Sequence, residues 1–152
     1  MLAGKISKRV VSDRLAWVDR MLNEIRALPL ESKSVFMQDS RNVWAAESCL
    51  RRALEALFDM GRHIAAKGFA EAVTEYKEIA ATLKRHDVIS AEELALMQKL
   101  AGYRNRLVHF YHDVSADELY EICASHLGDV ETTADTLRLW LANHPNLLDE
   151  TL

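Results

Sequence analysis

Glycine and proline are scarce in this sequence of 152 residues, which has five glycines and two prolines. Few positions are therefore suited to sharp turns, and this favours a helical bundle over a sheet. No run of about 18 apolar residues occurs, so no membrane-spanning helix is expected. The N-terminal stretch from Met1 to Lys5 lacks the apolar segment of a secretory signal, and we expect a cytoplasmic protein.

The two cysteines, Cys49 and Cys123, stand alone, without a CxxC pair or a histidine-rich neighbourhood. Neither a disulfide framework nor a zinc site is therefore predicted. Hydrophobic residues make up 49% and charged residues 28% of the chain, which is typical of a globular domain with a buried core. We expect residues 1–152 to form a single domain.

A strongly basic surface is also missing, because the formal net charge is −4 at pH 7. This balance argues against general coating of nucleic acid, and no DNA partner is expected. The stretch from Leu94 to His112 nevertheless contains no acidic residue and includes Lys99, Arg104 and Arg106. It predicts either a confined phosphate site or a solvated basic patch on an ordinary helix.

Apolar residues recur at helical spacing along most of the chain and predict an all-α fold of about five helices. The expected helices cover residues 7–28, about 35–68, 70–85, 91 to a point between 109 and 115, and 115–143. Gly61 interrupts the apolar stripe of the second helix, where glycine costs about 1 kcal/mol against alanine unless close packing uses it. A tight helix crossing is therefore expected at Gly61.

Capping boxes are predicted at the starts of the fourth and fifth helices, with Ser90 and Glu93 at the first and Ser115 and Glu118 at the second. The fourth helix then ends in an octet that combines a permanent cation, a histidine that titrates near neutral pH, and a phenol. Such groups suit work on a phosphodiester. The octet reads Arg104-Asn105-Arg106-Leu107-Val108-His109-Phe110-Tyr111.

Arg104 falls in the middle of an apolar arc on the fourth helix, formed by Met97, Leu100, Ala101, Leu107 and Val108. Tyr111, seven residues later, is expected within about 20° of Arg104 on the same face. A charge in this place is costly unless something compensates it. Either a buried carboxylate pairs with Arg104, or the arc faces a second subunit across a wet, functional cleft.

His109 lies about 140° around an ideal helix from Arg104, so the two side chains do not overlie one another. A departure from ideal angles at the helix end, or two copies of the helix packed about a two-fold axis, would bring them together. A metal shared by His109 and His112 is the weaker interpretation, because no third ligand is evident. We therefore predict no metal site.

Residues 39–139 closely resemble the HepT-like branch of the HEPN domains (higher eukaryotes and prokaryotes nucleotide-binding domains). The stretch from Leu100 to Tyr111 carries the resemblance, since it contains an Arg-x4-His-x-Tyr signature, and the stretch from Ala116 to Ile122 follows it. Residues 53–56 and 83–94 fit the same pattern. The signature alone is short, but its place between two capped helix starts makes it specific.

The resemblance implies the toxin of a bacterial toxin–antitoxin pair, an all-helical antiparallel bundle that dimerises around a cleft at the subunit interface. HEPN toxins are metal-independent ribonucleases, so the resemblance implies an RNA substrate and no cofactor. Transfer RNA and messenger RNA both stay open as the substrate. It also implies a cognate MntA-like nucleotidyltransferase antitoxin, which transfers AMP from ATP to the signature tyrosine. A homodimer is therefore expected, and a larger hetero-oligomer with the antitoxin stays open.

Carried over by position, Arg104 and His109 become the catalytic pair, Asn105 a supporting residue and Tyr111 the residue that receives AMP. A histidine can move protons near neutral pH, and an arginine can hold the phosphoryl oxygens of a transition state. The remaining cationic or titratable side chains of the stretch are candidate RNA contacts, namely Arg106, Lys99 and His112.

Two other functions stay open. One is a non-catalytic HEPN binding subunit that partners a nucleotidyltransferase, and the other is a helical interaction module whose octet forms interface salt bridges. The presence of both Arg104 and His109 favours the nuclease, because an adaptor does not need the pair. Replacement of His109 by alanine separates these functions, since loss of toxicity with an intact fold indicates catalysis.

Overall fold

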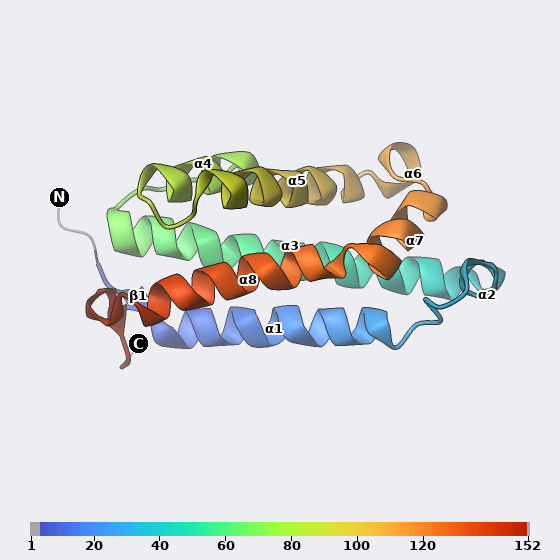
Figure 1. Cartoon of the computed structure of the whole chain (residues 1–152), viewed down its shortest axis with the longest axis horizontal. Helices are drawn as coiled ribbons and strands as arrows, with labels where there is room; N and C mark the ends of the chain where they lie inside the picture. Colours follow the sequence, from blue (N-terminus) through green and yellow to red (C-terminus); the bar gives the residue numbers. More distant parts are fainter. Residues whose placement is uncertain (1–3, 152) are drawn as a thin grey trace.

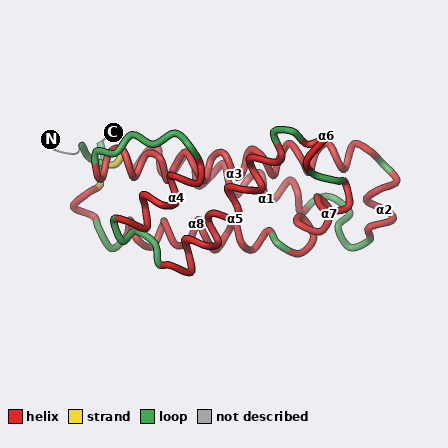
Figure 2. The backbone as a smooth tube through the Cα atoms, turned by 90° about the horizontal axis from the view of Figure 1, so that it is seen from above, coloured by secondary structure: helices red, strands yellow, loops and turns green. Residues whose placement is uncertain are grey.

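The computed structural model describes residues 4–151, apart from the side chain of Tyr111. The four longest helices (α1, α3, α5 and α8) form an elongated antiparallel bundle, and the two short strands β1 and β2 lie together at one end of it (Figures 1 and 2). The elements are β1 (Ile6–Ser7), α1 (Lys8–Arg26), α2 (Lys33–Gln38), α3 (Ser40–Phe69), α4 (Tyr76–Arg85), α5 (Ala91–Leu107), α6 (Phe110–Asp113), α7 (Ala116–Ser125), α8 (Leu127–Ala142), a 3-10 turn (Pro145–Leu147) and β2 (Leu148–Asp149).

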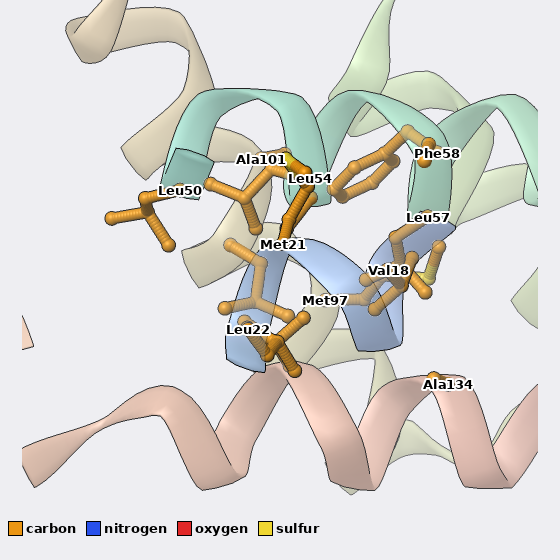
Figure 3. Close-up of a cluster of buried hydrophobic side chains, with 14 of the residues drawn as sticks. Val18, Met21, Leu22, Leu50, Leu54, Leu57, Phe58, Met97, Ala101 and Ala134 are labelled. Carbon is orange, nitrogen blue, oxygen red and sulfur yellow. The ribbon is translucent and has the colours of Figure 1, made fainter. Parts of the chain in front are cut away.

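The central helix α3 contacts α1, α4, α5, α7 and α8 and carries more of the buried hydrophobic residues than any other helix. Figure 3 shows Leu54 and Leu57 of α3 against Val18 and Leu22 of α1, with Met97 of α5 beside them. The apolar stripe predicted on α3 is confirmed, because every one of its positions is buried: Val43, Ala46, Leu50, Leu54, Leu57 and Ile64. None of the helices in the described part of the chain is long and apolar enough to cross a membrane.

The predicted close crossing at Gly61 is confirmed. A Cβ atom built at this position would lie 3.0 Å from Cγ2 of Ile79 and 3.3 Å from Cδ1 of Leu83, both on α4. Separations this short leave no room for a methyl group unless a neighbour moves. The glycine therefore lets α4 pack directly on α3.

Four helix boundaries differ from the expectation, and three of them lie at Asp39, Ala70 and His126. Asp39 separates α2 from α3, because its extended backbone and its side chain, which accepts a 2.9 Å hydrogen bond from the N–H of Arg41, cap α3. Ala70 adopts a left-handed conformation (φ 56°) that ends α3, so the next helix begins at Tyr76 and not at Ala70. His126 divides the expected fifth helix into α7 and α8.

The fourth predicted helix ends earlier than expected. Helix α5 stops at Leu107, and α6 begins after a turn at Val108 and His109 (Figure 1). Val108 is 48% exposed, so its expected place in the buried arc is wrong. The expectation that Tyr111 continues the face of Arg104 also fails, because the two residues belong to different helices.

The two predicted capping boxes have different outcomes. At the start of α5, Ser90 accepts from the N–H of Glu93, and the Glu93 carboxylate accepts from the N–H of Ser90, so the full box forms. At the start of α7, Ser115 accepts a 3.0 Å hydrogen bond from the N–H of Glu118. The Glu118 carboxylate turns instead to Arg106, so only half of the second box forms.

Candidate functional site

Arg104, near the end of α5, is paired with a carboxylate on the central helix. Its Nη2 donates a 3.0 Å hydrogen bond to Oε2 of Glu55 on α3. The two side chains are only 26% and 29% exposed. Of the two explanations for a cation on this apolar face, pairing with a partly buried carboxylate is therefore confirmed.

An aromatic ring supports the same guanidinium. The Cζ atom of Arg104 lies 4.4 Å from the ring centroid of Tyr76, the first residue of α4. The Tyr76 ring in turn stacks on Phe58 of α3, with centroids 5.0 Å apart and planes 19° apart. Burial raises the pKa of the Tyr76 phenol, while the charge of Arg104 acts in the opposite direction. Three helices thus hold the guanidinium in one place.

Two hollows adjoin Arg104, which lines both. The first, of about 470 Å³, is lined by Trp44, Glu47, Arg51, Glu55, Arg104, Leu107, Val108 and Phe110. The second, of about 540 Å³, is lined by Arg62, Thr74, Glu75, Tyr76, Arg104 and Asn105. Within the described part of the chain, the only hydrogen bond of the Arg104 side chain is the one to Glu55, and its Nε is buried without a partner.

The charges of the first hollow form a chain on α3. Arg51 donates to Glu47 at 3.2 Å and to Oε1 of Glu55 at 3.1 Å, while Oε2 of Glu55 accepts from Arg104. Two arginines and two glutamates balance one another by formal charge. This wall is therefore not a broad cationic patch, and an anion would be recognised by the local donors of Arg104.

His109 lies in the turn that joins α5 to α6. Its N–H donates a 3.1 Å hydrogen bond to the carbonyl of Arg106, and its own carbonyl accepts from the N–H groups of His112 and Asp113 at 2.9 Å each. The His109 side chain is exposed and lines neither of the two hollows beside Arg104. A single chain thus fixes the backbone of His109 but does not bring its imidazole into a hollow with Arg104.

The other predicted site residues take separate places. Asn105 is exposed and lines the second hollow. Lys99, about one and a half turns before Arg104 on α5, is exposed, and its ammonium lies 3.4 Å from the carboxylate of Asp129. His112 is exposed on α6. The backbone of Tyr111 belongs to α6, and its side chain lies outside the described part of the structure.

The guanidinium of Arg106 is hydrogen-bonded to other groups of the chain. Its Nη2 donates a 2.8 Å hydrogen bond to the carbonyl of Asp113 and also bonds the carboxylate of Glu118 on α7. The bond to Glu118 raises the pKa of the Arg106 guanidinium above its ordinary value. The residue expected as an RNA contact is thus engaged within the chain.

Sequence reasoning missed the residues that hold Arg104, which are Glu55 and Tyr76. Glu55 had one weak signal, since it interrupts the apolar run of α3 between Leu54 and Ala56. Tyr76 had none, because the structure had to show that α4 starts there. In the part of the chain that is described, no group of three or more His, Cys, Asp and Glu side chains is placed to hold a metal ion.

The antiparallel helical bundle described above matches the helical fold of a HEPN-type domain. The sequence profile of the ribonuclease HepT-like proteins matches residues 18–137. The chain therefore belongs to the ribonuclease HepT-like family, as its resemblance implied.

Relatives of known name agree with this assignment. The chain is similar to the mRNA nuclease HepT of Shewanella oneidensis, with 22% identity over 129 residues, which cover 85% of this chain and 96% of that protein. A solved structure of the tri-AMPylated Shewanella oneidensis HEPN toxin in complex with MNT antitoxin matches with a TM-score of 0.76 and 22% identity. That match covers 86% of this chain and 97% of the other.

Two further solved structures share the fold. A crystal structure of a toxin–antitoxin with AMP-PNP matches with a TM-score of 0.75 and 21% identity, over 84% of this chain and 97% of the other. YutE of Bacillus subtilis, described as a cytosolic protein of unknown function, matches with a TM-score of 0.73 and 19% identity. That match covers 92% of this chain and 94% of the other.

Proposed function

We propose that this chain is the toxin of a bacterial toxin–antitoxin pair and that it cleaves RNA without a metal ion. The observation that carries the proposal is the setting of Arg104 in a member of the HepT-like family. Its guanidinium is oriented by Glu55 and Tyr76 and lines two hollows. Such a cation is suited to grip the oxygens of a phosphodiester.

RNA brings its own nucleophile, the 2′-hydroxyl. In the proposed reaction His109 takes the proton of this hydroxyl while the 2′-oxygen attacks the phosphorus, and the bond from phosphorus to the 5′-oxygen of the next nucleotide breaks. The products are a 2′,3′-cyclic phosphate and a 5′-hydroxyl, whose proton comes from a second acid. Arg104 holds the non-bridging oxygens, where negative charge increases in the transition state. Asn105, at the second hollow, supports the substrate.

A homodimer fits this scheme. In one chain, the exposed imidazole of His109 lies outside both hollows that Arg104 lines. Two chains packed about a two-fold axis would place the turn of one beside the hollow of the other and would supply a second histidine as the acid. Trp44 and Val108, at 57% and 48% exposure on the rim of the first hollow, provide apolar surface for such packing.

The proposed partner is an MntA-like nucleotidyltransferase antitoxin that transfers AMP to Tyr111. In the related Shewanella oneidensis complex the HEPN toxin is tri-AMPylated and bound to MNT antitoxin. Tyr111 follows His109 by two residues and belongs to the short helix α6 that His109 caps. AMP at this position would put a phosphate and a nucleoside next to the proton carrier and block RNA. A stably modified chain that cleaved RNA at the native rate would contradict this.

The competing function is a non-catalytic binding subunit of a nucleotidyltransferase pair. It is favoured by one observation, the separation of the His109 side chain from both hollows within a single chain. The RNA-cleaving toxin and the non-catalytic subunit would use the same surface. A cleavage assay therefore distinguishes them, whereas a binding assay does not.

The deciding experiment is cleavage of total bacterial RNA by the purified chain in EDTA, after mass spectrometry has verified that Tyr111 is unmodified. His109→Ala is compared with His126→Ala, which removes an exposed histidine at the break between α7 and α8. We expect the native chain and His126→Ala to cleave and His109→Ala not to. No cleavage by the native chain would favour the binding subunit, and cleavage that needs added metal would refute the metal-independent mechanism.

A further inference from the structure

Arg106 connects the two sides of the turn that carries His109. It lies in the last turn of α5, and its Nη2 crosses residues 108–112 to reach the carbonyl of Asp113 at 2.8 Å. The same nitrogen bonds the carboxylate of Glu118 in the first turn of α7. One guanidinium thus joins the end of one helix, the end of α6 and the start of another.

The backbone of Arg106 closes the same segment from the other side. Its carbonyl accepts a 3.1 Å hydrogen bond from the N–H of His109. After α6 the chain is fixed again, because Val114 is buried and Ser115 caps α7 through the N–H of Glu118 at 3.0 Å. The segment with His109 and α6 is therefore a short loop with both ends attached to Arg106.

We propose that Arg106 and Glu118 form a clamp that fixes His109 relative to Arg104, so that both are positioning residues and Arg106 is not an RNA contact. This inference rests on the proposed nuclease function. The proton carrier lies on a turn, and α6 has only four residues, too few to hold its own position. The pair of Arg106 and Glu118 would therefore hold the turn with His109 and α6 in place.

The clamp and the RNA contact predict different behaviour. A phosphate-binding arginine acts mainly on affinity, so its loss raises KM and weakens the salt dependence of binding. A neighbouring glutamate would then oppose RNA binding, and its removal would lower KM. A clamp acts on the geometry of the reacting groups, so the loss of either partner lowers kcat, because small misplacements of catalytic groups are costly.

The experiment compares Arg106→Ala, Glu118→Ala and the double variant on one RNA substrate. Arg26→Ala is the matched control, because Arg26 and Glu131 also form an ion pair between two helices, α1 and α8, at similar exposure of 42% and 44%. The pair of Arg106 and Glu118 is 42% and 36% exposed. We expect each single variant to lower kcat by about tenfold or more with KM within about twofold. The double variant should be no worse than the poorer single one, and Arg26→Ala should match the native chain.

Hydrogen exchange provides a readout that does not depend on cleavage. The N–H groups of His112, Asp113 and Val114 are hydrogen-bonded within the clamped segment. In Arg106→Ala and in Glu118→Ala, peptides that cover residues 108–115 should exchange faster, while those from α1 and α3 should not change. Native exchange of this segment in either variant would overturn the clamp.

Kinetics can also overturn it. A raised KM with native kcat in Arg106→Ala, together with a lowered KM in Glu118→Ala, would make Arg106 an RNA contact. Native kcat in both variants would contradict any positioning role. If the native chain cleaves no RNA, the proposed function fails, and the exchange data then decide alone whether the clamp exists.

Discussion

Glu55 on α3 accepts a 3.0 Å hydrogen bond from Arg104 on α5, although the two residues are 49 positions apart. The other oxygen of Glu55 accepts from Arg51, one turn earlier on α3. Glu55 thus shares its charge between a local arginine and the candidate catalytic arginine. It orients the guanidinium of Arg104 and leaves the Nε side of that group without a partner in the described structure.

Glu55→Gln tests this relationship. The change keeps the shape of the side chain but removes the charge that compensates Arg104, so we expect a loss of about 1–2 kcal/mol in the free energy of unfolding. Cleavage should also fall, because Arg104 loses its orientation. Denaturant unfolding and kcat are measured beside Glu131→Gln, which removes the charge that pairs with Arg26 of α1. Native kcat in Glu55→Gln would show that Arg104 needs no orienting carboxylate.

Tyr76 offers a second test of how Arg104 is held. Phenylalanine at this position keeps an aromatic face under the guanidinium, whereas leucine removes it. We therefore expect Tyr76→Phe to stay within about 0.5 kcal/mol of the native free energy of unfolding and Tyr76→Leu to lose about 1 kcal/mol. Denaturant titrations of the two variants make the comparison. If both variants lose the same free energy of unfolding, the stabilisation comes from the phenol hydroxyl or from the size of the side chain, and not from the aromatic face.

Long helices with a regular apolar period could be predicted from the sequence. The expected span of α1 and the buried face of α3 are confirmed, because each helix repeats one apolar pattern over about 20 residues or more. The helix breaks could not be predicted, because apolar periodicity continues across them. Cys123 and Leu127, on either side of the break at His126, are both buried as one continuous helix would require. A change of backbone direction leaves such a pattern intact.

The candidate site was predictable only in part. The position of Arg104 on an apolar face indicated that something must compensate its charge, and it is indeed paired. Its partner could not be named, because the sequence contains 23 acidic residues and the pairing depends on how α3 and α5 lie together. The ion pair of Arg106 with Glu118 could not be predicted for the same reason, because the sequence places Glu118 in a capping box.

Alanine substitutions at two helical glycines, Gly61 and Gly102, are expected to change the free energy of unfolding in opposite directions. Gly61→Ala would place a Cβ 3.0 Å from Cγ2 of Ile79, whereas at Gly102, on α5, no heavy atom lies within 4 Å of the added Cβ. We expect Gly61→Ala to destabilise the fold by about 1–3 kcal/mol through overpacking. Gly102→Ala should stabilise it by about 0.5–1 kcal/mol through helix propensity. Thermal unfolding of both variants is the measurement, and a stabilised Gly61→Ala would mean that the crossing has room to relax.

His63 on α3 makes the stability of the fold depend on pH. Its Nε2 accepts a 2.9 Å hydrogen bond from the N–H of Ser7, just before α1, so the imidazole must be neutral for the bond to form. Burial lowers the pKa of His63, and the positive charges of Lys67 and Arg14 act in the same direction.

The sign of the effect follows from this lowered pKa. Above the unfolded value of about 6.5 neither state is protonated at His63, and the contribution to stability is complete. As the pH falls below about 6.5, the unfolded chain binds the proton first, so the free energy of unfolding decreases until His63 is protonated in the folded state as well. His63→Gln retains an acceptor that does not titrate and should flatten the decrease in the free energy of unfolding below about pH 6.5. Urea unfolding at several pH values measures the free energy of unfolding of the native chain, of His63→Gln and of the control His126→Ala. If the free energy of unfolding of His63→Gln falls with decreasing pH as steeply as that of the native chain, the pH dependence belongs to other groups.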